Sequence, residues 1–245
     1  MSNEDFSLSK SKLGTKEYWN DFYKLEQTNF QSNSEDTGEC WFDESDAENR
    51  MIDFLVSNFQ ELPTINEDSK IIDLGTGNGH LLFELYQHED EVYVNNRLIG
   101  LDYSENSVNF AKDIAKSKNL DNILFYQVDF LTKYKEFWGN EIFQNVDVFL
   151  DKGTLDAIAL NDAKYPFEDG KSYLGYELYP RIIEKSIKQE GIILITSCNF
   201  SEEELEKVIL ENSTRLKVWK KIKYPSFQFG GVKGSAICSI AFIKE

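Results

Sequence analysis

Residues 71–80 read Ile71-Ile72-Asp73-Leu74-Gly75-Thr76-Gly77-Asn78-Gly79-His80, and this stretch decides the fold. A short apolar run ends in an acid and is followed by three alternate glycines before a helical pattern begins. Glycine lets the backbone turn sharply and approach a ligand closely, and the first amides of a helix are unpaired donors for an anionic group. The stretch therefore predicts a strand, a nucleotide-cofactor turn and a helix.

The spacing of the glycines narrows the choice of cofactor. Dinucleotide sites use the pattern G-x-G-x-x-G, whose third glycine would fall where this chain has His80. Glycine at alternate positions after an acid instead favours S-adenosylmethionine. An isolated glycine-rich segment is also common as a plain turn or helix cap. The neighbouring predicted strands are therefore needed to support a cofactor site.

Two further predicted strands end in acids. Residues 98–102 follow a helical stretch around residues 81–86, as in one β-α-β unit, and end at Asp102. This acid is placed to accept hydrogen bonds from both ribose hydroxyls, and the alternative role, capping the next helix, is already filled by Ser104. Residues 123–128 lead into Asp129-Phe130. Asp129 alone would be interpreted as a solvated loop acid, but in this series it is placed to accept from an adenine amino group beside an aromatic ring.

The pattern of strands continues toward the C-terminus. Residues 146–150 form a fourth predicted strand and residues 191–196 a fifth. Residues 216–222 and 236–243 have no helix between them, which predicts an antiparallel pair at the sheet edge. We therefore expect an α/β fold with a seven-strand Rossmann-like sheet, mostly parallel with an antiparallel edge strand, and helices on both faces.

Composition is typical of one soluble enzyme domain. The chain has 245 residues, of which 41% are apolar and 14% aromatic, and this argues against wholesale disorder. No apolar run approaches the length of a membrane span and the N-terminus lacks a signal pattern, so we expect a soluble intracellular protein without a membrane partner. Three distant cysteines, Cys40, Cys198 and Cys238, indicate neither a disulfide framework nor a metal site.

The charge of the chain restricts its partners. With 43 acidic and 26 basic residues the net charge is −17, which repels phosphate backbones and disfavours a nucleic acid substrate. A basic protein partner is favoured modestly, since acidic surfaces also serve solubility.

The chain is expected to have three parts. Residues 1–13 should be disordered, residues 14–62 should form a helical extension or lid, and residues 63–245 should form the cofactor-binding domain. Aromatic residues at helical spacing predict an amphipathic helix over residues 14–30, whose ordinary role is core packing. Trp41, in the loop that follows, is a candidate lid residue.

These features resemble the seven-strand S-adenosylmethionine-dependent methyltransferases over nearly the whole chain from Gly14. After the fourth strand, Asp151-Lys152-Gly153-Thr154-Leu155-Asp156-Ala157 resembles the corresponding motif of the eukaryotic lysine methyltransferases that act on translation elongation factor 1-alpha. The chain departs from that family in a polar insertion at residues 161–172 and in the loop 89–96. Three outlying stretches are similar to the fungal member: Lys12-Leu13-Gly14-Thr15-Lys16-Glu17-Tyr18-Trp19, Cys40-Trp41-Phe42 and Tyr224-Pro225-Ser226-Phe227-Gln228-Phe229-Gly230-Gly231.

The resemblance implies a cytoplasmic protein-lysine N-methyltransferase with elongation factor 1-alpha as its protein substrate. In this family Asp151 and Thr154 would be catalytic, with Asp151 orienting a neutral lysine amine, and Trp41, Lys152 and Thr154 would contact the substrate. Asp73 would meet the cofactor amino group, and the glycine turn its methionine part. The implied cofactor-binding residues are Asp73, Gly75, Thr76, Gly77, Asn78, Gly79, Asp102, Tyr103, Ser104, Asp129, Phe130 and Asp151.

Alternative functions stay open at this point. Methyltransferases acting on amino groups of adenine, cytosine or glutamine resemble one another in a D/N/S-P-P-Y/F motif, where this chain has Asp151-Lys152-Gly153. The substrate could also be another protein or a small-molecule amine. The chain could also be a noncatalytic subunit that binds S-adenosylmethionine within a complex. Its intact glycine turn and Asp102 argue against the loss of a working site.

Overall fold

The computed structural model describes residues 10–62, 65–66, 68–90, 92–93, 96–225, 227–229, 232–234 and 236–245, with the backbone alone described at 227–229 and 232–234. The disorder expected for residues 1–13 falls mainly outside this set. Within it, the first element is the short 3-10 helix η1 (Lys12–Gly14), which is capped by Ser11.

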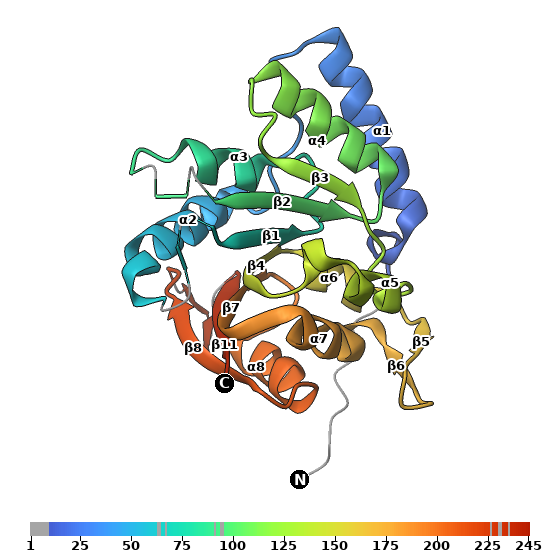
Figure 1. The fold of residues 1–245 in the computed structure, drawn as a ribbon, viewed down its shortest axis with the longest axis vertical. Helices are drawn as coiled ribbons and strands as arrows, with labels where there is room; N and C mark the ends of the chain where they lie inside the picture. The colour runs from blue at the N-terminus through green and yellow to red at the C-terminus, as the bar shows by residue number, and fades with distance from the viewer. Residues whose placement is uncertain are drawn as a thin grey trace.

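Seven strands form one sheet in the order β3-β2-β1-β4-β7-β11-β8 (Figure 1). The first five in this order run parallel, while β11 is antiparallel to both of its neighbours. The predicted mostly parallel sheet with antiparallel pairing at one edge is therefore confirmed, and the reversed strand is β11, one place in from the edge. The strands are β1 (Lys70–Leu74), β2 (Arg97–Asp102), β3 (Leu124–Gln127), β4 (Val146–Lys152), β7 (Ile187–Ser197), β8 (Leu216–Ile222) and β11 (Cys238–Lys244).

Among the described residues, eight α-helices cover the two faces of this sheet. They are α1 (Lys16–Ser32), α2 (Ala47–Asn58), α3 (His80–Gln87), α4 (Glu105–Ser117), α5 (Tyr134–Gly139), α6 (Thr154–Ala159), α7 (Gly175–Ser186) and α8 (Glu202–Glu211). Short 3-10 helices lie at η2 (Asp43–Ser45), η3 (Phe59–Glu61) and η4 (Glu141–Phe143). No helix in the described part of the chain has the length and apolarity needed to cross a membrane.

The helices fall into two groups, one on each face of the sheet. Neighbouring residues of a strand point to opposite sides, so Ile71 and Ile72 enter different cores. The core that contains Ile71 is filled by apolar side chains of α1 to α4, and the core that contains Ile72 by those of α5 to α8. The predicted helices on both faces are thereby confirmed.

Two small hairpins stand outside the main sheet. The strands β5 (Lys164–Pro166) and β6 (Ser172–Leu174) form one, with β5 inside the polar insertion and β6 at its C-terminal end, and β9 (Phe227–Phe229) pairs with β10 (Val232–Gly234). Figure 1 shows the β5–β6 hairpin projecting beside α5 and α6.

The N-terminal segment is packed onto the sheet domain. Helix α1 lies beside α4, and the η1 segment contacts the end of α6 (Figure 1). The Ser11 amide donates to the Leu160 carbonyl at 3.2 Å, and Asn161 Nδ2 donates to the Gly14 carbonyl at 2.8 Å. A Cβ on Gly14 would lie 2.6 Å from the Leu160 backbone, so this close approach requires glycine.

Candidate active site

A cavity of about 360 Å³ opens at the carboxyl ends of the central strands. Its walls come from the ends of β1, β2, β4 and β7, from the segment after β3, and from the N-terminal segment up to α2. In open α/β sheets, ligands bind at this edge, beside the strand where the order of connection reverses. That strand is β1, which lies between β2 and β4.

The glycine turn closes the end of β1 against the cavity. Gly75 and Gly77 have φ of 63° and 58°, in the left-handed region that favours glycine. A Cβ on Gly75 would lie 2.1 Å from Thr154 Oγ1, and one on Gly77 would lie 2.4 Å from the Tyr23 hydroxyl. Both positions exclude a side chain, so the turn presents bare backbone to the cavity.

Asp102 ties the turn to the end of β2. Its Oδ2 accepts from the Gly77 amide at 3.2 Å and its Oδ1 from the Ser104 amide at 2.8 Å. Burial raises the pKa of the Asp102 carboxyl. The hydroxyl of Ser104 accepts from the Ser107 amide, so Ser104 caps α4 as the sequence predicted. Asp102 and Tyr103 line the cavity, whereas Ser104 is fully buried behind it.

Asp73 and Asp129 contribute two more carboxylates to the cavity wall. Asp73 is only 3% exposed, and burial raises its pKa to about 7. Asp129 Oδ1 accepts from the Thr132 amide at 3.1 Å. Phe130 follows it and also borders the cavity, but its ring packs in the core against Phe137 and Tyr179.

The donor and acceptor chemistry of this wall fits S-adenosylmethionine. Along its length this molecule carries an amino group, two ribose hydroxyls and an adenine amino group, and all of these donate hydrogen bonds. The acceptors Asp73 and Asp102 lie at the ends of β1 and β2, and Asp129 comes just after β3; these strands are adjacent in that order in the sheet. The bare glycine backbone leaves room for the ligand at the β1 end.

Asp151 lies outside the cavity wall. This last carboxylate of β4 is fully buried, and Oδ1 accepts from the Thr154 amide at 2.9 Å while Oδ2 accepts from the Leu155 amide at 3.1 Å. Oδ2 also accepts from the Tyr179 hydroxyl at 2.6 Å. Burial raises the pKa of Asp151 to about 7. These contacts are those of a cap on α6, and the catalytic and cofactor-binding roles of Asp151 stay predictions.

Thr154 and Lys152 line the cavity, but both side chains have partners within the protein. Thr154 Oγ1 donates to the Leu74 carbonyl at 2.5 Å, which joins the ends of β1 and β4. Lys152 Nζ donates to the Trp41 carbonyl at 2.9 Å and lies 3.5 Å from Glu48 Oε2. Lys152 therefore holds the Trp41 segment at the cavity.

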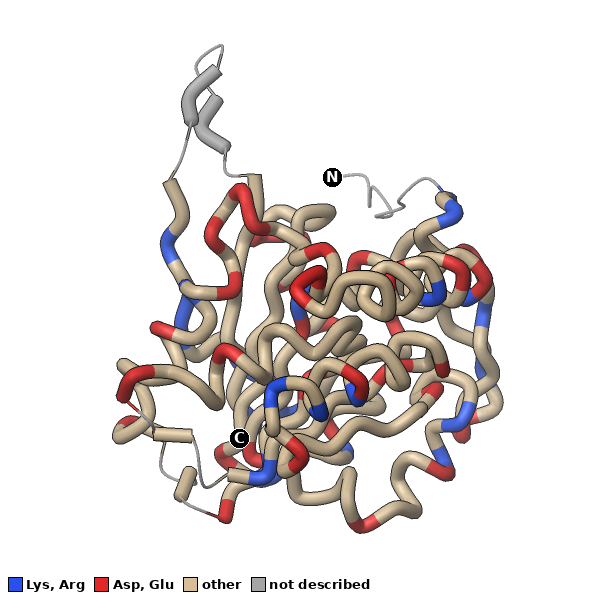
Figure 2. The backbone as a smooth tube through the Cα atoms, turned by 90° about the horizontal axis from the view of Figure 1, so that it is seen from above, with Lys and Arg blue, Asp and Glu red and all other residues tan. Residues whose placement is uncertain are grey.

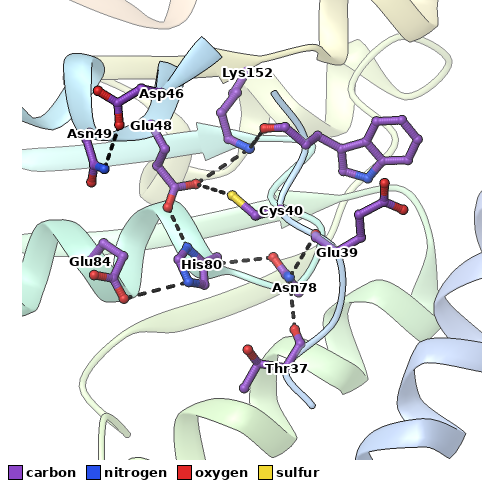
Figure 3. Close-up of polar contacts among 11 residues, drawn as sticks. Thr37, Glu39, Cys40, Asp46, Glu48, Asn49, Asn78, His80, Glu84 and Lys152 are labelled. Atoms are coloured by element: carbon purple, nitrogen blue, oxygen red, sulfur yellow. Dashed lines mark hydrogen bonds and ion pairs between the residues drawn. The ribbon is translucent and has the colours of Figure 1, made fainter. Parts of the chain in front are cut away.

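Glu48 is the centre of a buried polar network (Figure 3). Its carboxylate contacts Lys152, the ring of His80 and the Cys40 thiol. Burial alone would raise the pKa of Glu48, but the hydrogen bond from His80 and the charge of Lys152 outweigh it and hold this pKa below its ordinary value. Contacts with Cys40 and Glu48 raise the pKa of His80 to about 10, so the imidazole is protonated at neutral pH. Sequence reasoning missed Glu48 because it stands on an amphipathic helix with no motif around it.

The same residues form the one candidate metal-ligand cluster among the described residues. The ligand atoms of Cys40, Glu48 and His80 lie within 4.8 Å of one another. The Lys152 ammonium beside Glu48 repels a cation, and the protonated His80 already neutralises the carboxylate. The arrangement is therefore that of an ion-pair network.

The Trp41 segment is fastened to the cofactor turn as well. Asn78 Nδ2 donates to the carbonyls of Thr37 and Glu39, at 3.0 and 3.3 Å (Figure 3). The Trp41 ring lies 5.4 Å from that of Trp19 and borders the cavity. Its Nε1 is buried without a hydrogen-bond partner among the described residues. Trp41 is thus a wall of the cavity and also part of the aromatic packing of α1.

Two further sets of cavity residues were not found from the sequence. Tyr23 lies on the predicted amphipathic helix over residues 14–30, for which core packing is expected, yet its hydroxyl faces Gly77 and its side chain lines the cavity. Asp156, Cys198 and Asn199 border the cavity at the β7 end. Asp156 stands in the quoted motif after β4, but nothing in the sequence connects it with residues about forty positions later.

Comparison with known proteins agrees with this geometry. The methyltransferase domain family matches residues 65–231. The chain is 49% identical to "Protein-lysine N-methyltransferase EFM4" of Saccharomyces cerevisiae, with 97% of each chain covered. It is 37% identical to the protein of the same name from Schizosaccharomyces pombe, with 96% of this chain and 95% of the relative covered.

A solved structure shows the same fold. The TehB-like S-adenosylmethionine-dependent methyltransferase from Corynebacterium glutamicum superposes with a TM-score of 0.54 at 14% identity, covering 94% of this chain and 100% of the other. With a cavity that fits S-adenosylmethionine and with relatives similar over almost their whole length, the chain belongs to the family of S-adenosylmethionine-dependent protein-lysine N-methyltransferases.

Proposed function

We propose that this enzyme methylates a lysine of translation elongation factor 1-alpha. The observation that carries the proposal is similarity over nearly the full length to relatives with that activity in their name. "EEF1A lysine methyltransferase 2" of Homo sapiens is 32% identical over 96% of this chain and 87% of its own, and the Danio rerio protein of the same name is 34% identical over 98% and 90%.

The chemistry sets the task of the protein. When bound, S-adenosylmethionine supplies an electrophilic methyl group, which the amine lone pair attacks as the carbon–sulfur bond breaks and leaves its electron pair on sulfur. The enzyme has to align a neutral lysine amine with this methyl group and keep water away. An ammonium has no free lone pair, and desolvation in the cavity favours the neutral amine because it lowers the amine pKa.

One end of the cavity is suited to the cofactor and the other to the substrate lysine. Asp73, the glycine turn and Asp102 hold the cofactor at the β1 and β2 ends. Trp41 and Phe42, on the segment fastened by Lys152, provide apolar walls for the lysine stem and an aromatic face for its head group. The Phe42 ring also packs against Gly153, where a Cβ would lie 3.1 Å from it.

Net charge supports a basic protein substrate. The chain carries a net charge of −17, and Figure 2 shows Asp and Glu spread over the molecule rather than gathered in one region. The electric field of these charges attracts a basic protein surface within about one Debye length and raises the rate at which the two proteins meet. A cytoplasmic location is part of the same proposal, because a translation elongation factor is met there, and imaging a tagged chain tests it.

A methylation assay tests the proposed substrate. Purified enzyme, labelled S-adenosylmethionine and native elongation factor 1-alpha should give a labelled lysine that peptide mass spectrometry locates. The initial rate at limiting substrate should fall several-fold between about 50 and 300 mM salt, because screening slows association of opposite charges. Histones, which are basic but unrelated, are the matched control. Equal labelling of histones, or no labelling of the elongation factor, would overturn the proposal.

A further inference from the structure

The end of β7 forms the wall of the cavity farthest from the predicted adenosine site. In the sheet, β4 separates β7 from β1, β2 and β3, whose ends carry the three cofactor acids. Lys152 of β4 is paired in register with Thr196 of β7, so Cys198 and Asn199 continue just beyond the sheet edge. Both residues border the cavity. The topology therefore puts them on the side where the substrate has to enter.

We propose that the Asn199 side chain contacts the amine of the substrate lysine, and that Asp156 is the positioning residue that holds Asn199 in place. The inference rests on the proposed lysine methylation and adds a residue that acts on the nucleophile.

Asp156 fixes the backbone of this segment through several hydrogen bonds. Its carboxylate accepts from the Ser197 hydroxyl, from the Cys198 amide at 2.9 Å and from the Asn199 amide at 3.4 Å. Asp156 is 4% exposed and Ser197 is fully buried, so the clamp is shielded from water. Ser197 Oγ in turn accepts from the amides of Asn199 and Phe200, at 3.2 and 3.1 Å. A buried carboxylate that accepts from three donors of one segment serves to hold that segment in place.

The Asn199 side chain remains available for a ligand. In the described part of the chain, its one side-chain hydrogen bond is a long contact from the Cys198 thiol to Oδ1, at 3.8 Å. Its backbone is held on both sides, whereas the half-buried amide group stands at the cavity. A polar side chain on a rigid support is well suited to orient a reacting group.

An amide oxygen is chemically suited to this position. It accepts an N–H from a neutral amine and so directs the nitrogen lone pair. A carboxylate in the same place would instead stabilise the ammonium form and raise the amine pKa, because an opposite charge within a few ångströms favours the charged state. The neighbouring acids are consistent with this role for Asn199, since the Asp156 carboxylate is engaged by residues 197–199 and Asp151 lies outside the cavity wall.

Variants of Asn199 give the test, using the whole chain with elongation factor 1-alpha. Asn199→Ala should lower kcat by about 10- to 100-fold while the Kd for S-adenosylmethionine changes by less than about threefold, since only an interaction with the nucleophile is lost. Asn199→Asp keeps the shape and adds a charge. It should move the rise of kcat with pH upward by about one unit, so that turnover is about tenfold lower near pH 7.5 and recovers by about pH 9.5.

Two more variants separate positioning from general damage. Asp156→Asn should lower kcat like Asn199→Ala without moving the pH profile, because it loosens the support and adds no charge at the amine. Asn212→Ala is the matched control, since this half-buried asparagine bonds Val208 and Arg181 away from the cavity. It should leave kcat and the pH profile unchanged even if the melting temperature falls.

The outcomes separate this inference from the proposed function. An active wild-type enzyme whose Asn199→Ala variant keeps normal kcat and KM overturns the role of Asn199. An unshifted pH profile in Asn199→Asp overturns the contact with the amine. Failure of the wild-type enzyme to methylate any protein lysine overturns the proposed function and this inference together.

Discussion

Affinity for S-adenosylmethionine is expected to depend on pH through Asp73. This carboxyl ends β1 at the cavity, and burial raises its pKa to about 7 against the opposing attraction of Lys152. At pH 6 the cofactor-free enzyme therefore holds Asp73 mostly protonated. A bound ammonium group favours the carboxylate, so binding has to expel this proton and is weaker at low pH.

The magnitude follows from the ionised fraction. With a pKa of about 7, this fraction rises from about 1/11 at pH 6 to about 3/4 at pH 7.5, so affinity should rise roughly eightfold, or about 1.2 kcal/mol. Titration calorimetry at both pH values, in buffers with different ionisation enthalpies, measures the affinity and the proton released. Nearly one proton should leave at pH 6. Asp73→Asn should bind more weakly at pH 7.5 and show no pH dependence in this window. A wild-type affinity that is flat from pH 6 to 7.5, without proton release, would refute the reasoning.

Three other substitutions test the remaining contacts. Asp102→Ala should weaken S-adenosylmethionine binding by about 10- to 100-fold in calorimetry, because charge-assisted hydrogen bonds contribute on the order of 1.5–3 kcal/mol each; unchanged affinity in a folded variant would remove Asp102 from the site. Glu48→Gln should raise KM for the protein substrate by about tenfold and leave cofactor affinity nearly unchanged, because Lys152 then holds the Trp41 segment less firmly. Glu61→Gln, which breaks an exposed ion pair with Lys220, is its control and should have no effect. Asp151→Asn should keep turnover within about threefold, whereas Asp151→Ala should lower the free energy of unfolding by about 2–4 kcal/mol in denaturant titrations, because it leaves buried donors of α6 and Tyr179 unpaired; a 100-fold loss of turnover in a stable Asp151→Asn protein would restore the catalytic role.

The fold was predictable because its signals are local. Most strands of the main sheet contain a buried apolar run, such as Ile71-Ile72 in β1 or residues 192–195 in β7, and such runs keep their character whatever packs on them. The structure extends the fifth predicted strand from residues 191–196 to β7 (Ile187–Ser197). Pairing with β4 accounts for the extension, because register contacts between Val146 and Ile187 recruit residues that have no apolar pattern. The β5–β6 hairpin was not expected, since it begins in a polar insertion and its strands have three residues each.

The cavity was predictable only in part, because much of it is assembled across the chain. Asp73, Asp102 and Asp129 stand at or near strand ends, and all three line the cavity as the sequence led us to expect, while their contacts with the cofactor stay predictions. The residues that hold the N-terminal segment against the cavity could not be identified in this way. Asn78 donates to the carbonyl of Thr37, and Glu48 pairs with Lys152. These partners are separated by forty residues or more, and neither Asn78 nor Glu48 shows a pattern that names its partner. Asn78 and Glu48 support the cavity because they are buried beside these partners, and the sequence alone shows neither the burial nor the proximity.

The motif after β4 shows why residue type alone misleads. Asp151 and Asp156 are five positions apart and both are buried. Asp151 is still in the strand, so its side chain points to the face opposite that of Leu150, into the core shared with Tyr179, and caps α6. Asp156 lies within the first turns of α6 and reaches the end of β7 beside the cavity. A neutral amide can replace Asp151, because its one oxygen can still accept from the Thr154 and Leu155 amides while its NH₂ group donates to the Tyr179 hydroxyl. At Asp156 the Cys198 and Asn199 amides donate to different oxygens. The same change sets an NH₂ group against one of these amides, so Asp156→Asn should lose turnover where Asp151→Asn does not. Parallel measurement of melting temperature and single-turnover methylation on both variants decides the assignment, and the reverse order of effects would exchange the two roles.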